Sequence, residues 1–315
     1  MKILITGGGG FLGSRLAEAL RARDPHAAIT LLDVAFPPGL AAKFDCVTGD
    51  LAAPEILARA LGANTDAIFH LAAVVSGGAE ADFELGYHVN LDGTRALLEA
   101  ARKLAQPPRI VYTSSVAAFG GDLPDVLDDS TTPAPQTSYG TQKVIGEYLV
   151  ADFTRKGFID GRSLRLPTIV VRPGKPNLAA SSFASSIIRE PIAGAESLCP
   201  VPPSTGVWIL SPRRAVEAFL HAHDLPASAW PTTRVVNLPG ITLSVREMIE
   251  AMGRVAGKKS VSLVKFVPDA RIQAIVETWP VRFRTELAVA MGFKADHDFE
   301  SIVRDHVESE KARPK

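Results

Sequence analysis

The sequence lacks a net charge, has only two cysteines, and has no apolar run long enough to cross a bilayer. Lys plus Arg and Asp plus Glu both number 34, so neither a nucleic-acid footprint nor a polybasic membrane contact is indicated. Cys46 and Cys199 lack metal-ligand spacing and form no disulfide framework, which favours reducing conditions and the cytoplasm. We therefore expect no nucleic acid, no membrane and no bound metal as partners.

The length and composition indicate a soluble globular protein with more than one core. The chain has 315 residues, of which 46% are apolar and 22% charged. We expect a large domain over residues 1–175, to which a segment of about 206–238 returns. Residues 176–205 and 239–315 are expected to form a smaller mixed lobe.

The first residues predict a strand, a glycine turn and a helix. The apolar run Ile3–Ile5 ends at glycines spaced Gly7, Gly10 and Gly13, and a helical pattern follows from Ser14 to Arg23. Such glycines allow a tight turn, a close approach to a pyrophosphate, and close packing of helix on strand. The helix N-terminus supplies amide donors for phosphate. This predicts a dinucleotide site.

Two acids follow at the ends of the next strands. Asp33 ends the run Ala28–Leu32, where a carboxylate would meet the adenosine ribose and repel the 2′-phosphate of NADP. The predicted cofactor is therefore NAD. Asp50 follows a third strand end, and either contact with the adenine or capping of the next helix accounts for it.

A fourth predicted strand covers residues 67–73 and runs into small residues that let a cofactor lie against the backbone. His70 is interpreted as a packed strand residue rather than a catalyst. Ser76 lies in a predicted loop, residues 74–78, from which it would contact substrate. Asn90 opens a predicted helix to about Lys103, and the sequence leaves open whether it caps that helix or braces a site.

Tyr139 and Lys143 stand four residues apart, on one face of a helix predicted to reach about Lys156. A phenol has a pKa of about 10, and a nearby ammonium favours its ionised form. The pair is therefore a candidate general base for an alcohol. It follows a fifth strand, residues 109–113, which ends in two serines, and an irregular loop over residues 120–138.

Taken together, these motifs resemble the extended short-chain dehydrogenase/reductase family over about the first 175 residues. The matching positions, in the family's order, are Thr6, Gly7, Gly10, Phe11, Gly13, Asp33, Asp50, Leu51, His70, Leu71, Ala72, Ala73, Asn90, Gly93, Thr94, Ser114, Ser115, Tyr139 and Lys143. The resemblance implies a Rossmann-type doubly wound α/β fold with a parallel sheet. It places NAD against Gly7, Gly10, Phe11, Leu12, Gly13, Asp33, Asp50, Leu51, Leu71, Ala72, Ala73, Asn90, Tyr139, Lys143, Pro167 and Ile169.

The resemblance also implies a mechanism. Tyr139 takes the alcohol proton while hydride passes to the nicotinamide, and Lys143 binds the nicotinamide ribose and lowers the tyrosine pKa. The family's catalytic serine lies four residues before an aromatic-glycine pair. Here that pair is Phe119-Gly120, which indicates Ser115 rather than Ser114, although Phe119 replaces the usual tyrosine.

In the second half, the run from Leu164 to Gly174 predicts a strand that leads into a hydroxyl-rich stretch. An acidic substrate needs a cation, best an arginine that binds in a bidentate manner. Arg172, Arg189 and Arg213 are the candidates. The expected substrate contacts are Ser76, Ser115, Tyr139, Arg172, Asn177, Ser182 and Arg189.

Three functions are compatible with these residues. The run from Leu166 to Pro191, with Trp208 and Trp279, is similar to the D-erythronate dehydrogenases, which oxidise C2 of a four-carbon sugar acid with NAD. A nucleotide-sugar epimerase is the first alternative, although residues 177–205 offer only Arg189 for a diphosphate. A dehydratase is not indicated, because the sequence lacks the acidic pair that the dehydratases of the family have after the position of Ser115. A non-catalytic NAD-binding protein is the alternative of another class.

The family commonly dimerises through two helices, which correspond here to residues near 92–104 and 139–156. A homodimer is therefore expected. Val144, Leu149 and Val150 serve either that interface or the core.

Overall fold

The computed structural model describes residues 1–174 and 180–311, which divide into two compact units. Unit 1 contains Met1–Ala118, Pro135–Leu166 and Ala215–Asn237. Unit 2 contains the described residues of Phe119–Ala134, Pro167–Arg214 and Leu238–Lys315. The segment that returns to unit 1 thus begins at Ala215, whereas the sequence prediction began it at about residue 206.

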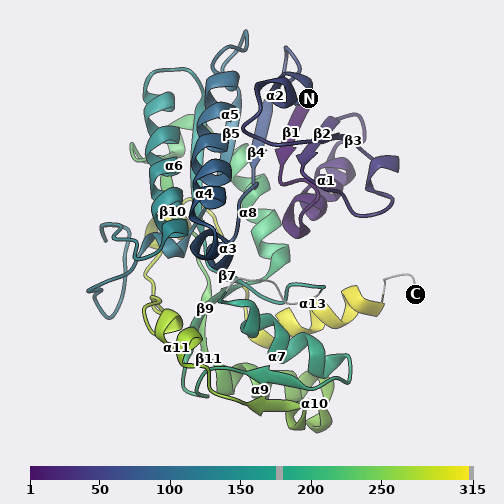
Figure 1. Cartoon of the computed structure of the whole chain (residues 1–315), viewed down its shortest axis with the longest axis vertical. Coiled ribbons are helices and arrows are strands. Elements are labelled where there is room, and N and C mark those ends of the chain that lie inside the picture. Colours follow the sequence, from purple (N-terminus) through teal and green to yellow (C-terminus); the bar gives the residue numbers. More distant parts are fainter. Residues whose placement is uncertain (175–179, 312–315) are drawn as a thin grey trace. The chain divides into compact units, whose positions relative to one another are not determined.

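Unit 1 is built on a parallel sheet, which has seven strands within the described residues (Figure 1). Its order is β10-β6-β5-β4-β1-β2-β3, and every pairing is parallel. The order reverses direction beside β1, as in a doubly wound fold, so the predicted fold class is confirmed. The strands are β1 (Lys2–Thr6), β2 (Ala28–Asp33), β3 (Asp45–Thr48), β4 (Ala67–His70), β5 (Arg109–Ser115), β6 (Asp160–Leu166) and β10 (Val235–Asn237).

Helices cover both faces of this sheet, which explains why most of its strand residues are buried. On β4, Ile68 belongs to a core cluster with Leu97 of α5 and Val150 of α6. The next residue, Phe69, contacts the His223 ring of α8 on the other face. The helical elements here are α1 (Phe11–Arg23), η1 (Leu40–Ala42), α2 (Pro54–Ala60), α3 (Ser76–Ala81), α4 (Phe83–Tyr87), η2 (His88–Asp92), α5 (Gly93–Ala101), η3 (Val116–Ala118), α6 (Ser138–Arg155), α8 (Pro212–Asp224) and η4 (Ala227–Ala229).

Three predicted boundaries differ from the structure. Ser76 begins helix α3, so residues 74–78 are not wholly a loop. Asn90 does not open a helix, because it lies inside the π-helical turn η2, which continues α4 into α5. The strand predicted over residues 164–174 is split into β6 and the short β7 (Thr168–Ile169) at Pro167, which has no backbone N–H for a ladder.

Unit 2 has two small sheets within the described residues, in the orders β11-β9-β7 and β12-β8. Its core is formed by apolar residues of α7, α9 and α13 packed on β9. Helix α9 begins at a capping box in which Ser244 and Glu247 bind each other's backbone N–H, as its sequence predicts. The elements are α7 (Ser182–Ile192), β8 (Ser197–Cys199), β9 (Gly206–Leu210), β11 (Ile241–Ser244), α9 (Val245–Ala256), α10 (Lys258–Ser262), β12 (Val264–Phe266), α11 (Ala270–Val276), α12 (Glu286–Ala290) and α13 (Phe299–Lys311).

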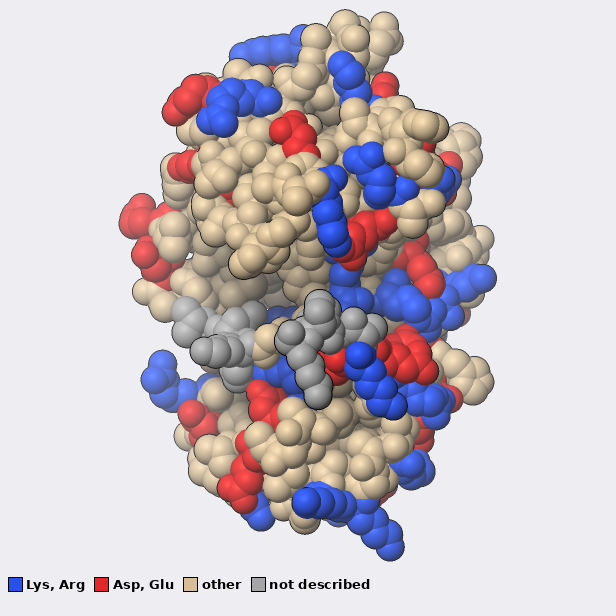
Figure 2. All heavy atoms as spheres, turned by 90° about the vertical axis from the view of Figure 1, so that its right-hand side faces the viewer, with Lys and Arg blue, Asp and Glu red and all other residues tan. Residues whose placement is uncertain are grey.

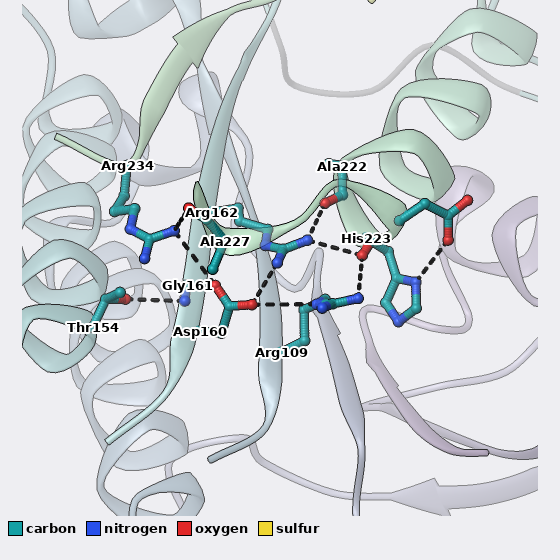
Figure 3. A network of polar contacts seen from close by, with 10 residues as sticks. Arg109, Thr154, Asp160, Gly161, Arg162, Ala222, His223, Ala227 and Arg234 are labelled. Atoms are coloured by element: carbon teal, nitrogen blue, oxygen red, sulfur yellow. Dashed lines mark hydrogen bonds and ion pairs between the residues drawn. The ribbon is translucent and has the colours of Figure 1, made fainter. Parts of the chain in front are cut away.

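At the start of β5 and β6, three arginines converge on Asp160 (Figure 3). Arg109, Arg162 and Arg234 each donate to its carboxylate. Two of these arginines also contact the last turn of α8. Arg162 donates to the carbonyls of Ala222 and His223, and Arg109 donates to the His223 carbonyl at 2.6 Å. A helix C-terminus favours cations. The cluster therefore ties the C-terminal end of α8 to the first residues of β5 and β6.

The charges on the surface are mixed in sign. On the face in Figure 2, blue Lys and Arg side chains are interspersed with red Asp and Glu side chains. Across the described residues, we find no helix whose length and hydropathy would suit a membrane span.

Candidate active site

Of the three regularly spaced glycines in the loop between β1 and α1, Gly7 and Gly13 are packed too tightly for a side chain. A Cβ on Gly7, whose φ is +70°, would lie 2.7 Å from the backbone nitrogen of Ala72. A Cβ on Gly13 would lie 2.1 Å from the carbonyl oxygen of Gly7. At Gly10, by contrast, a Cβ would meet only that oxygen, at 3.1 Å. Gly10 therefore presents an open side just before the N-terminus of α1, which begins with Phe11 and Leu12.

Asp33, at the end of β2, is held beside this loop. Its carboxylate accepts the N–H of Gly9 at 3.0 Å and that of Val34 at 2.8 Å. Both bonds are made by backbone donors, so the carboxylate keeps a fixed place next to the glycines. It is half-buried, which leaves part of it open to a ligand.

Asp50 does not cap helix α2, so one of its two predicted accounts is wrong. The N-cap is Ala53, and it makes no side-chain capping bond. Asp50 instead accepts the N–H of Ala52 at 2.9 Å and lies 2.6 Å from Nε2 of His88. The hydrogen bond that His88 donates to the Asp50 carboxylate raises the pKa of His88. Its neighbour Leu51 is buried in the core, so the side chain does not face a ligand.

A buried chain of hydrogen bonds runs behind the end of β4. Thr94 donates to the Asn90 carbonyl at 2.6 Å, so its oxygen accepts from Nε2 of His70 at 2.8 Å. Nδ1 of His70 then accepts from the Thr6 hydroxyl at 2.6 Å, and the Thr6 oxygen receives the N–H of Ala72. Burial lowers the pKa of His70 to about 3, and repulsion by Lys143 adds to this. His70 is thus a neutral packed residue. Its hydrogen bonds hold the backbone at the end of β4, where Leu71, Ala72 and Ala73 follow.

Asn90 braces this region. Its amide oxygen accepts the N–H of Val74 at 2.7 Å, and its amide nitrogen donates to the Val74 carbonyl at 3.0 Å. The same nitrogen donates to Oε1 of Gln142 on α6 at 2.7 Å. The bracing account is therefore the one that its contacts support, and the helix-cap account is wrong because the N-cap of α5 is Asp92.

Tyr139 and Lys143 lie on the first turns of α6, whose N-cap Thr137 accepts the N–H of Gly140. The Lys143 ammonium lies 5.5 Å from the centre of the Tyr139 ring and donates to the Thr113 carbonyl of β5 at 2.8 Å. The lysine is 2% exposed. Burial lowers its pKa to about 7, and attraction by Glu147 opposes that fall.

The two serines at the end of β5 have different surroundings. Ser114 is buried and donates to the Glu147 carboxylate at 2.5 Å. Ser115, which points to the other face as strand alternation requires, is half-buried and accepts the N–H of Ala117 at 3.1 Å. A Cβ on Gly140 would lie 2.1 Å from the Ala117 carbonyl oxygen, so this turn packs directly against the first turn of α6. The turn that follows Ser115 therefore packs against the helix turn that carries Tyr139.

Glu147 escaped the sequence analysis. Its carboxylate is 4% exposed and forms a bidentate pair with Arg165 of β6, at 2.8 Å and 2.6 Å. A signal was present, because Glu147 follows Lys143 by four residues on the same helix face. Glutamate at such a spacing is common on exposed helices, so only burial identifies it.

In unit 2, one helix organises Arg172. Its guanidinium donates to Ser181 at 2.7 Å, its N–H donates to Ser185 at 3.0 Å, and its carbonyl accepts from Arg189 at 2.6 Å. These three partners recur every four residues, so Ser185 and Arg189 lie on one face of α7, in line with its N-cap residue Ser181. Arg189 also pairs with Glu190 at 2.5 Å, and it is therefore a structural arginine rather than a free contact for substrate.

The remaining predicted contacts are placed as follows. Arg213 pairs with Asp305 at 2.8 Å. Ser182 begins α7, and Pro167 and Ile169 are buried where β7 joins β9. Asn177 lies outside the described residues.

A comparison with known protein families agrees with this geometry. Residues 3–230 match the model of the NAD dependent epimerase/dehydratase family. The chain belongs to this NAD-dependent epimerase/dehydratase family. Its cofactor is accordingly NAD.

Two relatives within this family match nearly the whole chain. A D-erythronate dehydrogenase of Cupriavidus necator is 52% identical, over 98% of this chain and 98% of its own length. A D-erythronate dehydrogenase of Haemophilus influenzae is 44% identical, over 98% and 99%. A solved structure described as the nucleoside-diphosphate-sugar epimerase from Agrobacterium tumefaciens has a TM-score of 0.91 at 42% identity, over 99% and 94%.

The residues present in unit 1 fit NAD. The open side at Gly10 suits a pyrophosphate at the start of α1, and the anchored Asp33 carboxylate suits ribose hydroxyls.

Proposed function

We propose that the protein oxidises the C2 hydroxyl of a small sugar acid with NAD, and that its substrate is D-erythronate. The observation that carries this proposal is the near full-length identity of 52% and 44% to two D-erythronate dehydrogenases. The arrangement of Ser115, Tyr139 and Lys143 supports it, because alcohol oxidation needs a base and a hydrogen-bond donor at one oxygen.

The proposed roles follow from the contacts in unit 1. NAD, when bound, supplies the acceptor for the hydride. Tyr139 takes the hydroxyl proton, and Ser115 donates a hydrogen bond to the oxygen as it becomes a carbonyl. Lys143 holds positive charge beside the Tyr139 ring, which favours the phenolate, and the Thr113 carbonyl fixes the ammonium in place.

Arg172 is proposed to bind the carboxylate of the substrate. Both the backbone and the guanidinium of Arg172 are held by α7, so the side chain is oriented before a ligand arrives. Preorganised arginine recognises a carboxylate with little loss of entropy.

The test is incubation of the enzyme with NAD⁺ and D-erythronate while NADH is followed at 340 nm. We expect NADH in proportion to the substrate oxidised, and a keto acid as product. If the sugar acids from four to six carbons yield no NADH, the proposal is wrong. Turnover of a nucleoside-diphosphate sugar without net NADH would support the epimerase, as the description of the Agrobacterium structure suggests. NAD binding without any turnover would support a binding protein.

The carboxylate contact has its own test. Arg172→Gln should raise KM for D-erythronate by about 10- to 100-fold, as expected for loss of a charged hydrogen bond. The activity of the variant on erythritol, an uncharged polyol, should equal that of the wild type. Arg254→Gln removes an exposed arginine that pairs with Glu300, and it is the matched control. An equal loss on acid and polyol would show that Arg172 does not read the carboxylate.

A homodimer, a cytoplasmic location and a role in sugar-acid catabolism complete the proposal. Val144 and Val150 are buried in unit 1 and Leu149 packs against its core, which favours the core role for these residues. Tyr148 of α6 is 67% exposed and is the better candidate. Light scattering of the wild type and Tyr148→Glu tests this, with a smaller mass expected for the variant.

A further inference from the structure

Tyr139, Lys143 and Glu147 form a row along α6, with one residue per turn. The first two belong to the proposed active site. The third is buried and carries a carboxylate one turn beyond the lysine.

Three hydrogen bonds hold the Glu147 carboxylate. Arg165 donates to both oxygens, and Ser114 donates to Oε1 at 2.5 Å. Arg165 is itself tied to Asn237 of β10 at 3.4 Å. The carboxylate therefore has a fixed place between α6 and two strands of the sheet.

Stability alone is a weak reason for this arrangement. A buried ion pair loses much of its Coulombic gain to desolvation, and well-packed apolar residues often stabilise a fold as well or better. Buried charges cluster at functional sites, so the Glu147 carboxylate can be expected to act electrostatically on Lys143.

The other groups in contact with Lys143 carry no negative charge, whereas Glu147 is an anion. The Tyr112 ring of β5 lies 5.0 Å from the ammonium, and burial raises the pKa of Tyr112 far above its usual value, so it stays a neutral phenol. His70 of β4 is neutral, since burial lowers its pKa to about 3. Thr113 offers a carbonyl, and Tyr139 the phenol on which the lysine acts.

Lys143 needs such a neighbour. Burial lowers its pKa to about 7, which would leave the amine near half-protonated at neutral pH. Attraction by Glu147 raises that pKa against the effect of burial. Without the carboxylate, more of the lysine would be neutral and unable to support the Tyr139 phenolate.

We propose that Glu147 is a positioning residue for catalysis: its carboxylate, fixed by Arg165 and Ser114, keeps the Lys143 ammonium charged beside Tyr139. The inference rests on the proposed role of Lys143, but it does not depend on which substrate is oxidised. Ser114 thereby has a task distinct from that of Ser115.

The test titrates Lys143 by NMR on the substrate-free protein, with ¹³C-labelled lysine side chains and Lys143→Met to assign the signal. Glu147→Gln should lower the titration midpoint by about one pH unit, the size expected for a neighbouring opposite charge. Glu147→Asp should restore part of the shift. Asp152→Asn removes an exposed carboxylate from the same helix and should leave the midpoint unchanged.

The pH profile of sugar-acid oxidation gives a second readout. In Glu147→Gln, the alkaline limb of kcat should move to lower pH in step with the NMR midpoint. If the midpoint stays at the wild-type value while the melting temperature falls, Glu147 is only structural and the inference is overturned. If no sugar acid is oxidised, the proposed function fails, whereas the NMR result still decides the role of Glu147.

Discussion

The hydroxyl of Ser114 donates to the carboxylate of Glu147 at 2.5 Å, so it points away from the turn that carries Ser115. Two adjacent serines therefore have different hydrogen-bond partners, and the sequence motif indicates Ser115 as the catalytic one. The distinction leads to the first prediction.

Ser115→Ala should lower kcat by about 10²- to 10³-fold, the usual cost of removing one donor to a developing oxyanion. Ser114→Ala should change kcat less and should lower the melting temperature, because Glu147 loses a buried hydrogen bond. Steady-state kinetics and thermal unfolding of both variants check this. A larger kcat loss in Ser114→Ala would reverse the assignment.

Tyr139→Phe should lower kcat by about 10²- to 10⁴-fold, since the phenol oxygen that would take the substrate proton is absent. Binding of NAD should persist, because the ring and Lys143 remain. Calorimetric titration with NAD⁺ separates the two effects. Full activity in this variant would refute Tyr139 as the base.

Asp33→Asn should shift the cofactor preference from NAD towards NADP. The carboxylate is held by the backbone N–H groups of Gly9 and Val34, next to where a 2′-phosphate would lie. Loss of a hydrogen bond to a charged group predicts a fall of about 10- to 100-fold in kcat/KM for NAD. Asp45→Asn, at an exposed acid on β3, is the control. An unchanged NAD to NADP ratio would contradict this placement.

Gly13→Ala should abolish NAD binding and lower the melting temperature. Its Cβ would sit 2.1 Å from the Gly7 carbonyl oxygen, which forces α1 away from the loop. Gly62→Ala is the matched control, because a Cβ there has nothing within 4 Å. Equal melting temperatures for the two variants would show that the helix can shift without cost.

Acid should destabilise the protein partly through His70. Its pKa is about 3 in the folded state and about 6.5 unfolded, so the unfolded chain binds a proton first as pH falls. Its contribution is complete above pH 6.5 and is lost progressively as the pH falls towards about 3. Urea unfolding at several pH values should show a flatter dependence for His70→Asn than for the wild type or His26→Gln.

Much of unit 1 could be predicted from the sequence because its signals are local. The glycine spacing, the acid at the end of β2 and the Tyr-Lys pair lie within single elements or turns, where periodicity applies. The return of a later segment to this sheet was also predictable in outline, since Val235–Asn237 pairs with β6.

The rest depends on contacts between distant residues. Leu51 carries a family motif but is buried against Gly93, and Arg189 binds the backbone of Arg172 instead of remaining available. Glu147 is defined by Arg165, which lies 18 positions along the chain on another element. A single sequence does not show such pairings, because each residue type is ordinary where it stands.

The arginine cluster at Asp160 has a consequence for biosynthesis. Its members are spread from Arg109 to Arg234, and β10, which covers the edge of β6, ends at Asn237. Synthesis from the N-terminus therefore delivers the strands β7, β8 and β9 of unit 2 before unit 1 can close. Until then the nascent chain exposes an open strand edge, which favours mispairing. The need for chaperones should be greatest while the ribosome translates residues 167–237.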